Sequence, residues 1–280
     1  MDTSAYFTAL ARRAEAANPI SEGDYVKDGL RFCHKCNTPK QCCVDFGAGP
    51  VIVPCMCRCR IEEREAEDEA IRRQQETERI ERLRGSCFPY REMTQWTFDN
   101  DDGTNERITD MAKRYVANFA KFREMGRGLL LRGPVGTGKT FIAACIANAL
   151  IDKGVSCYMT SFPQLVNTIQ GMHDGRQSYI DEINQNDLLI IDDLSTERDT
   201  DYMSEIVYNV VDGRYRVGLP LIVTTNLTSD ELKRPGSLSK ERIYSRLIDM
   251  CVVVEVTGAD RRKKNYRSEY EECKGLLGLE

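Results

Sequence analysis

The sequence predicts an α/β protein in which helices sandwich a parallel five-stranded sheet, preceded by a small cysteine-rich N-terminal domain. Short apolar runs alternate with helical stretches from about residue 90. These runs are rich in Val, Ile and Leu on both faces, which is typical of a sheet that helices cover on both sides. The N-terminal domain is indicated by cysteine placement, because seven of the twelve cysteines lie between Cys33 and Cys59.

Length and charge exclude several classes of protein. At roughly 150 residues per domain, 280 residues fit one large domain or two unequal ones. The net charge of −5 provides no global basic field for nucleic acid. With His34 and His173 as the only histidines, a catalytic site built on several histidines is nearly excluded.

No apolar run reaches the ~18–20 residues of a membrane span, and residues 1–18 lack the pattern of a secretory signal. We therefore expect no membrane association and a cytoplasmic location. In such a reducing compartment, clustered cysteines bind metal more often than they form disulfides.

The predicted elements follow one another in the order of an α/β fold. The expected strands cover residues 128–132, 155–160, 188–192, 221–225 and 251–256, and the expected helices cover 105–123, 139–153, 162–172, 202–216 and 240–249. Ahead of them, sixteen of the twenty-five residues in 60–84 are charged. Acid-before-base pairs such as Glu69 and Arg73 stand four apart there, which favours a solvated connecting helix, with docking on a partner as the alternative. We therefore divide the chain into an N-terminal module (1–60), a charged helical linker (61–87) and a large α/β domain (88–280).

The N-terminal module carries two clusters of cysteines with metal-binding spacing. Cys33 and Cys36 form a C-x-x-C pair, and Cys55, Cys57 and Cys59 follow about twenty residues later. Two thiolates from a tight turn and two more from a second segment complete a tetrahedral Zn²⁺ site, so four of these five cysteines are the expected ligands. An iron–sulfur cluster and free thiols are the alternatives. A metal would hold such a short module folded, and its purpose would be partner binding.

The clearest motif is Gly133-Pro-Val-Gly-Thr-Gly-Lys-Thr140, which follows an apolar run and precedes a helical stretch. In this context the motif is a phosphate-binding loop: the backbone amides and the helix N-terminus point at phosphate oxygens. Lys139 is expected to reach the β and γ phosphates of ATP or ADP, and Thr140 to bind Mg²⁺. The expected nucleotide contacts in this segment are Gly133, Pro134, Val135, Gly136, Thr137, Gly138, Lys139, Thr140 and Phe141.

Polar residues stand at the ends of two further apolar strands. Asp192 and Asp193 follow the run Leu188–Ile191, and Asn226 follows 221–225. The carboxyl ends of parallel strands are where α/β sheets place functional groups. We expect Asp192 to hold Mg²⁺, Asp193 to position or deprotonate the attacking water, and Asn226 to orient that water or sense the γ-phosphate.

Two arginine pairs complete the candidate set. Arg242 and Arg246 are four apart and lie on one face of a predicted helix. Arginine is suited to stabilising the charge of a transferring phosphoryl group. Arg261 and Arg262 follow the last strand, where an arginine could reach the nucleotide; contact with a DNA phosphate and a plain surface charge are the alternatives.

These motifs resemble AAA+ ATPases and, more closely, the DnaC/DnaI family of bacterial and phage helicase loaders. The resemblance rests on residues 127–140, 188–194, 224–226 and 241–247, and covers roughly residues 88–268. It implies a P-loop AAA+ fold with Arg246 as an arginine finger that acts on ATP held by a neighbouring subunit. Arg242 is the substitute for that role, and Arg261 or Arg262 is the second sensor. Many AAA+ proteins carry Glu where Asp193 stands, so we infer slow hydrolysis that suits a switch.

The implied function is an ATP-dependent helicase loader. By resemblance, the N-terminal domain grips the hexameric replicative helicase, the AAA+ domain self-associates, and single-stranded DNA is contacted in a central pore during replication initiation. IstB transposition helpers share much of the same core and are the alternative. A zinc-dependent adaptor whose ATP site only stabilises the fold is a third possibility.

Overall fold

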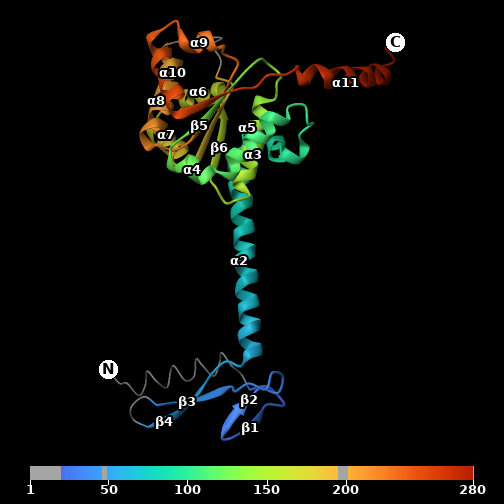
Figure 1. Ribbon diagram of the computed structural model, residues 1–280, viewed down its shortest axis with the longest axis vertical. Helices are drawn as coiled ribbons and strands as arrows, with labels where there is room; N and C mark the ends of the chain where they lie inside the picture. Colours follow the sequence, from blue (N-terminus) through green and yellow to red (C-terminus); the bar gives the residue numbers. More distant parts are fainter. Residues whose placement is uncertain (1–19, 46–48, 195–200, 280) are drawn as a thin grey trace. The chain divides into compact units, whose positions relative to one another are not determined.

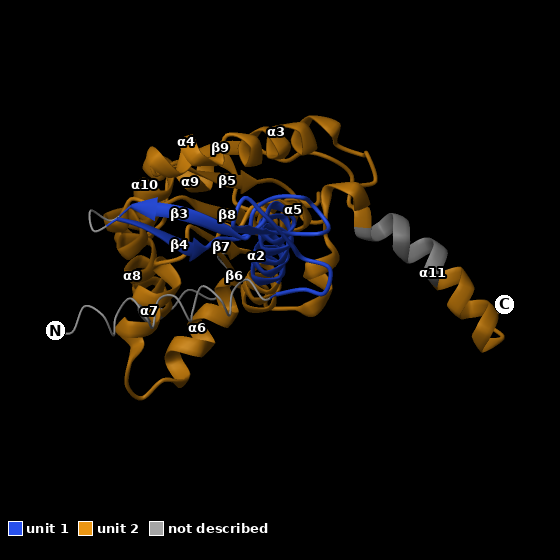
Figure 2. Cartoon of the chain, turned by 90° about the horizontal axis from the view of Figure 1, so that it is seen from below, with its two compact units in different colours: residues 1–77 blue, residues 78–280 orange. Residues whose placement is uncertain are grey.

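The computed structural model describes residues 20–45, 49–194 and 201–279, and the side chains of 201–202 and 262–269 are not among those described. The chain forms two compact units, residues 1–77 and 78–280 (Figure 2). Helix α2 (Arg58–Cys87) runs through the division between them. In the part of the chain that the structure describes, no helix is both long enough and apolar enough to cross a membrane.

Unit 1 contains two small antiparallel hairpins. Strands β1 (Tyr25–Lys27) and β2 (Leu30–Phe32) form the first, and β3 (Gln41–Asp45) and β4 (Pro50–Pro54) form the second. The chain then enters α2, which contains the charged helix expected from the sequence. The side chains of α2 are exposed over most of its length, and Ile80 and Leu83 near its end pack against the core of unit 2.

Unit 2 is built on a five-stranded sheet of order β6-β7-β8-β5-β9, in which every pairing is parallel. Its strands are β5 (Gly128–Arg132), β6 (Cys157–Ser161), β7 (Leu188–Asp192), β8 (Leu221–Thr225) and β9 (Cys251–Glu255). The fold class predicted from the sequence is confirmed. Each of the five expected strands forms within one residue or two of its expected bounds.

Helices cover both faces of this sheet (Figure 1). Successive residues of β5 point to opposite sides, so Leu130 joins one buried cluster while Leu129 and Leu131 join the other. The second cluster is covered by α3 (Glu106–Ala117) and α5 (Lys139–Ile151). The first cluster is covered by α6 (Phe162–Gly171), α7 (Arg176–Asn184), α8 (Asp201–Val217) and α10 (Leu238–Met250).

Some helices differ from the expectation. The helix expected over 105–123 forms as two, α3 and α4 (Phe119–Glu124), because the side chain of Asn118 bonds the carbonyl of Arg114 and the backbone breaks there. Helix α9 (Ser229–Lys233) has a capping box between Thr228 and Glu231, which the sequence analysis missed. Helices α7 and α11 (Arg261–Leu277) were also missed, because their polar composition weakens the apolar periodicity.

A buried arginine ties two loops together at the amino-terminal edge of the sheet. Arg214 of α8 has no exposed surface, and its guanidinium donates to the carbonyls of Asn184, Asn186, Asp187 and Pro220 at 2.6–3.1 Å. Burial lowers the pKa of Arg214 to about 10. These bonds fix the loops that lead into β7 and β8, the two strands that carry Asp192 and Asn226.

Candidate nucleotide site and cysteine cluster

The glycine-rich loop connects β5 to α5, at the carboxyl edge of the sheet. Gly136 and Gly138 have φ of +78° and +90°, a conformation that side chains rarely adopt. A Cβ on Gly136 would also meet the Asp260 carboxylate, and one on Gly138 would meet the Arg261 guanidinium. Gly138 caps the N-terminus of α5, where unpaired backbone amides favour an anion. At the end of the predicted contact segment, the Phe141 ring lies 6.0 Å from that of Trp96.

Lys139 is buried and turns back over the loop. Its ammonium donates to the carbonyls of Gly133 and Pro134 at 2.8 and 2.7 Å, and to Oδ1 of Asn226 at 2.8 Å. The loop lysine and the predicted sensor residue therefore lie together, although they belong to different strand ends. Phosphate oxygens would offer this ammonium stronger acceptors than neutral carbonyls do.

Thr224 organises the two acids at the end of β7. Its hydroxyl donates to Oδ1 of Asp192 at 2.6 Å and accepts from the backbone N–H of Asp193 at 2.8 Å. Burial raises the pKa of Asp192; repulsion from Asp193 adds to this, and hydrogen bonds from Thr224 and Thr140 oppose it. A half-buried carboxylate beside a second one and near the Thr140 hydroxyl is a donor set that suits Mg²⁺.

Asp193 turns the chain out of the strand. Its φ is +55°, in the left-handed region that Asp tolerates better than most residues. Oδ1 of Asp193 accepts from the side-chain amide of Asn226 at 3.3 Å. The structure thus brings together Lys139, Asp192, Asp193 and Asn226, whose strands are neighbours in the sheet order β7-β8-β5.

Arg261 lies on the glycine-rich loop. Its backbone N–H donates to the carbonyl of Gly136 at 2.9 Å, and its guanidinium pairs with Asp101 and Asp102 at 3.4 and 3.2 Å. Asp101 is almost fully buried and also accepts from the hydroxyl of Thr109 at 2.6 Å. The Arg262 side chain lies outside the described residues.

Arg246 makes its contacts with α8. Its guanidinium forms an ion pair with Asp212 at 2.7 Å, donates to the hydroxyl of Tyr208 at 2.9 Å, and lies 4.6 Å from the Tyr208 ring centroid. Arg242 lies one turn earlier and its side chain is exposed. The two arginines share a face of α10, as expected, but differ in their surroundings.

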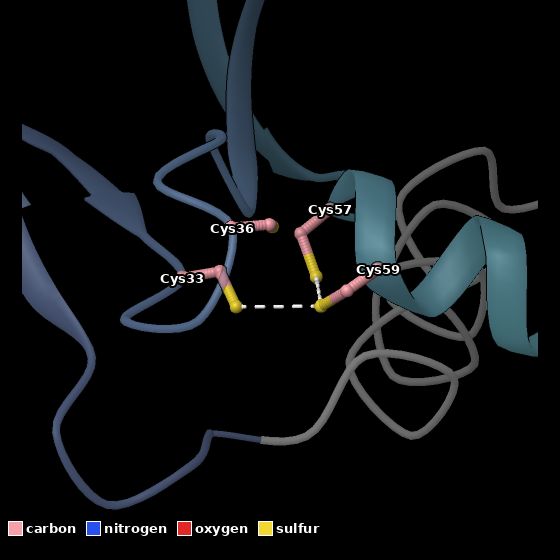
Figure 3. Close-up of side chains that lie close together, drawn as sticks. All are labelled: Cys33, Cys36, Cys57 and Cys59. Atoms are coloured by element: carbon pink, nitrogen blue, oxygen red, sulfur yellow. Dashed lines mark hydrogen bonds between the residues drawn. The ribbon is translucent and has the colours of Figure 1, made fainter.

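Four of the five predicted cysteine ligands come together in unit 1 (Figure 3). The sulfurs of Cys33, Cys36, Cys57 and Cys59 all lie within 4.8 Å of one another. Sγ of Cys59 is 3.6 Å from that of Cys33 and 3.4 Å from that of Cys57. A tetrahedral site with Zn–S bonds of ~2.3 Å separates sulfurs by ~3.8 Å, so these distances fit one metal ion.

Each pair is presented by a defined local structure. Cys33 and Cys36 flank a turn at the end of β2. Cys57 directly precedes α2, and Cys59 lies two residues further on, in the first turn of that helix. Cys55 lies outside the cluster, and its thiol donates to the carbonyl of Pro39 at 3.5 Å.

A buried ion pair lies beside the cysteine cluster. Lys40 is 5% exposed and its ammonium donates to Asp24 at 2.7 Å. Burial alone would lower the pKa of Lys40, but Asp24 and the nearby Cys33 and Cys57 thiols raise it above its usual value. A divalent metal with four thiolates carries a charge of −2, and a buried ammonium close by reduces the cost of burying that charge.

Sequence reasoning missed Thr224 and the acidic partners Asp101 and Asp212. Thr224 had a usable signal, because it is a polar residue at the end of an otherwise apolar strand in the motif Thr-Thr-Asn. Asp101 and Asp212 had none, since they stand 160 and 34 positions from the arginines that they bind.

A family model for IstB-like ATP-binding proteins matches residues 60–269. The chain belongs to this family. Membership of this family therefore supports nucleotide binding at the glycine-rich loop, in agreement with the geometry of the loop. The matched segment includes every candidate nucleotide residue from Gly133 to Arg262. It begins in α2 and leaves the cysteine cluster outside.

The relatives of this IstB-like chain include a replicative helicase loader, an uncharacterised protein and a putative ATP-binding protein in an insertion sequence. DnaI of Bacillus subtilis, a replicative helicase loader, is 26% identical over 169 residues, which is 56% of this chain and 53% of DnaI. YqaM of the same organism is 28% identical over 201 residues, or 68% of this chain and 63% of YqaM. The match therefore spans between half and two thirds of the length of these two relatives. The putative ATP-binding protein Rv3427c in an insertion sequence of Mycobacterium tuberculosis is 27% identical over 203 residues, or 71% of this chain and 78% of that protein.

Solved structures support the fold. The match with the crystal structure of DnaI covers 64% of this IstB-like chain and 99% of the solved DnaI chain, with a TM-score of 0.51 and 27% identity. The DnaC helicase loader covers 60% of this chain with a TM-score of 0.52 and 22% identity, which supports the fold alone. Together they establish the P-loop AAA+ fold expected from the sequence.

Proposed function

We propose that this protein is an ATP-dependent helicase loader that binds a hexameric replicative helicase and loads it onto single-stranded DNA during replication initiation. The observation that carries the proposal is the combination of two sites in one chain. A four-cysteine module precedes an AAA+ domain, similar to DnaI, in which Lys139, Asp192, Asp193 and Asn226 converge at one edge of the sheet.

ATP hydrolysis at this edge would use the chain's own groups in distinct roles. The loop from Gly133 to Phe141 holds the phosphates, and Lys139 exchanges its carbonyl acceptors for phosphate oxygens. Thr140 and Asp192 would hold Mg²⁺, and the charge of this ion would stabilise the phosphates of the nucleotide. Asp193 orients the attacking water and accepts its proton, with Asn226 fixing the position of that carboxylate. Arg261 covers the loop as the second sensor.

The arginine finger would come from a neighbouring subunit. Within one chain, Arg246 is bound to Asp212 and Tyr208, so its guanidinium lies between α10 and α8 with the side chain 26% exposed. Arg242 is the substitute candidate because its side chain is exposed. Activity then depends on assembly, and hydrolysis releases the loader after the helicase ring has been opened.

The cysteine module would bind Zn²⁺ through Cys33, Cys36, Cys57 and Cys59 and present a surface to the helicase. A metal would stabilise a unit of this size, because the described residues of unit 1 contribute to neither of the large hydrophobic clusters. We place the helicase contact here because the module lies outside the matched ATPase segment.

Two experiments test the proposal. Pull-down of purified replicative helicases by the tagged, zinc-loaded full chain should retain one of them, and the variant Cys57→Ser should lose it. Loading of that helicase onto protein-coated single-stranded DNA should then require the chain and ATP. Failure to bind any replicative helicase, with normal zinc content and ATP binding, would refute the proposal.

A transposition helper is the second candidate. The observation that favours it is the family model for IstB-like ATP-binding proteins, which matches residues 60–269, together with the similarity to an ATP-binding protein in an insertion sequence. This function predicts ATP-dependent binding to double-stranded DNA and capture of a transposase. Retention of a transposase in place of a helicase in the same pull-down would favour this second function.

Contact with single-stranded DNA would involve the segment from α6 to α7. His173 and Arg176 are exposed there, on the connection between the two helices and the first turn of α7. Binding that weakens steeply with salt is expected, because phosphate contacts release counterions. The variant Arg176→Ala should weaken it without changing ATP binding.

A further inference from the structure

A broad groove of about 750 Å³ opens on unit 2 beside the edge strand β9. Its walls come from α3, α4, the start of β5 and β9. The apolar lining consists of Met111, Tyr115, Phe122, Met125, Leu129, Val252 and Val254. Met125 and Val252 are 59% and 49% exposed, so this apolar surface is open to solvent. We call it the β9 groove.

The rim of the β9 groove is basic. Arg107, Arg114 and Lys121 line it and are exposed, and Asp110 is the one acid among its lining residues. Three positive charges and one negative charge give the lining a net charge of +2. A partner segment that fits both features is apolar on one side and acidic beside it.

The end of α11 has these two properties. Tyr270, Cys273 and Leu277 are spaced i, i+3, i+7, which places them on one helical face, and all three are exposed. Leu276, on a neighbouring face, and Leu279, just after the end of α11, are also exposed, with exposed fractions of 83% and 58%. We call residues 270–279 the C-terminal stripe.

Glu271, Glu272 and Lys274 give residues 270–279 a net charge of −1, opposite in sign to the net charge of the groove lining, and Lys274 lies 3.9 Å from Glu271. Neighbouring leucines that are this exposed usually mark an interaction surface, because isolated folded chains keep such side chains from water.

We propose that the C-terminal stripe of one copy docks in the β9 groove of a second copy. The inference rests on the proposed function only in that the ATPase assembles with copies of itself. Because the stripe and the groove are different surfaces, the contact is head-to-tail, and repeating it builds a ring or a spiral.

The start of α11 explains why the occupant is a second copy. Arg261, its first residue, is anchored on the nucleotide loop through the carbonyl of Gly136. Leu277 lies sixteen residues further on, ~24 Å along a helix. With this anchor in place the stripe of the same chain stays exposed, as the leucines of this structure do. The same anchor links docking to the nucleotide, since a change in the loop redirects the helix that carries the stripe.

A cross-linking experiment identifies the occupant, because Cys273 already lies on the stripe and is exposed. A copy carrying Met125→Cys and Cys273→Ser is mixed with the unsubstituted, differently tagged chain, both full-length and zinc-loaded, and treated with a short bismaleimide in the presence of a non-hydrolysable ATP analogue. We expect a cross-linked pair that contains both tags. The control replaces the second chain with Cys273→Ser and should lose this pair.

A second measurement does not depend on cross-linking. The variant Leu277→Asp should raise the concentration for half-maximal self-association at least tenfold in sedimentation, at unchanged thermal stability. The matched control Ile71→Asp, at an exposed apolar residue of α2, should change it less than twofold.

Two results would overturn the inference: cross-links only within one chain when Met125→Cys is introduced beside native Cys273, or normal assembly of Leu277→Asp. Failure of the proposed function is distinguishable, because it appears as absent helicase binding in the unsubstituted protein, whatever the stripe does.

Discussion

The ammonium nitrogen of Lys139 lies 2.8 Å from Oδ1 of Asn226, 87 residues away in the sequence. The amide nitrogen of the same Asn226 side chain donates to Oδ1 of Asp193 at 3.3 Å. One neutral side chain therefore bridges the cation of the nucleotide loop and the anion that would position water. If a bound phosphate takes the Lys139 ammonium as its donor, the bond from Lys139 to Asn226 would be exchanged, and this would couple Asn226 to the γ-phosphate.

The first prediction concerns this bridge. Asn226→Ala should lower kcat for ATP hydrolysis by about 10²-fold, because the Asp193 carboxylate loses its positioning donor. The Kd for ATP should change less than threefold, since the loop is intact. Stopped assays of phosphate release and equilibrium nucleotide titration separate the two quantities. If Asn226→Ala loses ATP binding and hydrolysis to the same extent, Asn226 serves to bind phosphate and does not position Asp193.

The arginine finger in trans can be tested by mixing variants. Arg246→Ala alone should keep nucleotide binding and lose hydrolysis by about 10³-fold or more, and Lys139→Ala should lose nucleotide binding. A mixture of the two inactive proteins should regain activity, because an intact Arg246 from one copy meets ATP held by the other. Arg242→Ala is the matched variant one turn away. If Arg242→Ala is inactive while Arg246→Ala hydrolyses ATP normally, the finger is Arg242.

Zinc binding should depend on four cysteines and not on the fifth. Purified protein should contain about one zinc per chain, following the four-thiolate rule for structural sites. Cys36→Ser and Cys59→Ser should each lose the metal and unfold unit 1, because removing one thiolate opens the site. Cys55→Ser should keep the metal, since this thiol lies outside the cluster. Metal analysis with circular dichroism measures both effects, and equal loss in all three variants would contradict the assignment.

Asp101 should act on the nucleotide through Arg261. We expect Asp101→Asn to weaken ATP binding several-fold, because it removes the buried charge that holds the guanidinium on the loop. Arg261→Ala should weaken it at least as much, and the double variant no more than Arg261→Ala. Asp102→Asn, at a more exposed partner of the same arginine, is the control with a smaller effect. If the losses of ATP-binding free energy in Asp101→Asn and Arg261→Ala add up in the double variant, Asp101 acts independently of Arg261.

Arg214 should be important for stability without contacting the nucleotide. Replacing it by Leu removes five hydrogen bonds to the four carbonyls that it binds, and should cost about 3 kcal/mol or more of unfolding free energy. Arg216→Leu, at an exposed arginine of the same helix, should cost less than about 1 kcal/mol. Thermal unfolding of both variants measures the difference. A Tm for Arg214→Leu equal to that of Arg216→Leu would disprove the role.

Much of the site was predictable because its information is local. The glycine-rich loop, the acids after β7 and the Asn after β8 are short motifs at strand ends, and strand ends of a parallel sheet share one edge. The elements themselves follow from apolar runs and periodicity, so the strands formed near their expected bounds. Helices α7 and α11 were missed for the same reason, since polar helices have little periodicity to detect.

The sequence alone determined the fold class, the nucleotide loop and the set of five candidate cysteines. The tertiary structure decided which four thiols meet, that Asp101 and Asp102 hold Arg261, and that Arg246 is bound to Asp212 and Tyr208. The physical reason is that motifs depend on spacing within a few residues, whereas these contacts depend on how distant segments pack. Cys55 and Cys57 are only two positions apart. The path of the chain into α2 brings the Cys57 thiol to Cys33 and Cys36 and leaves the Cys55 thiol outside the cluster.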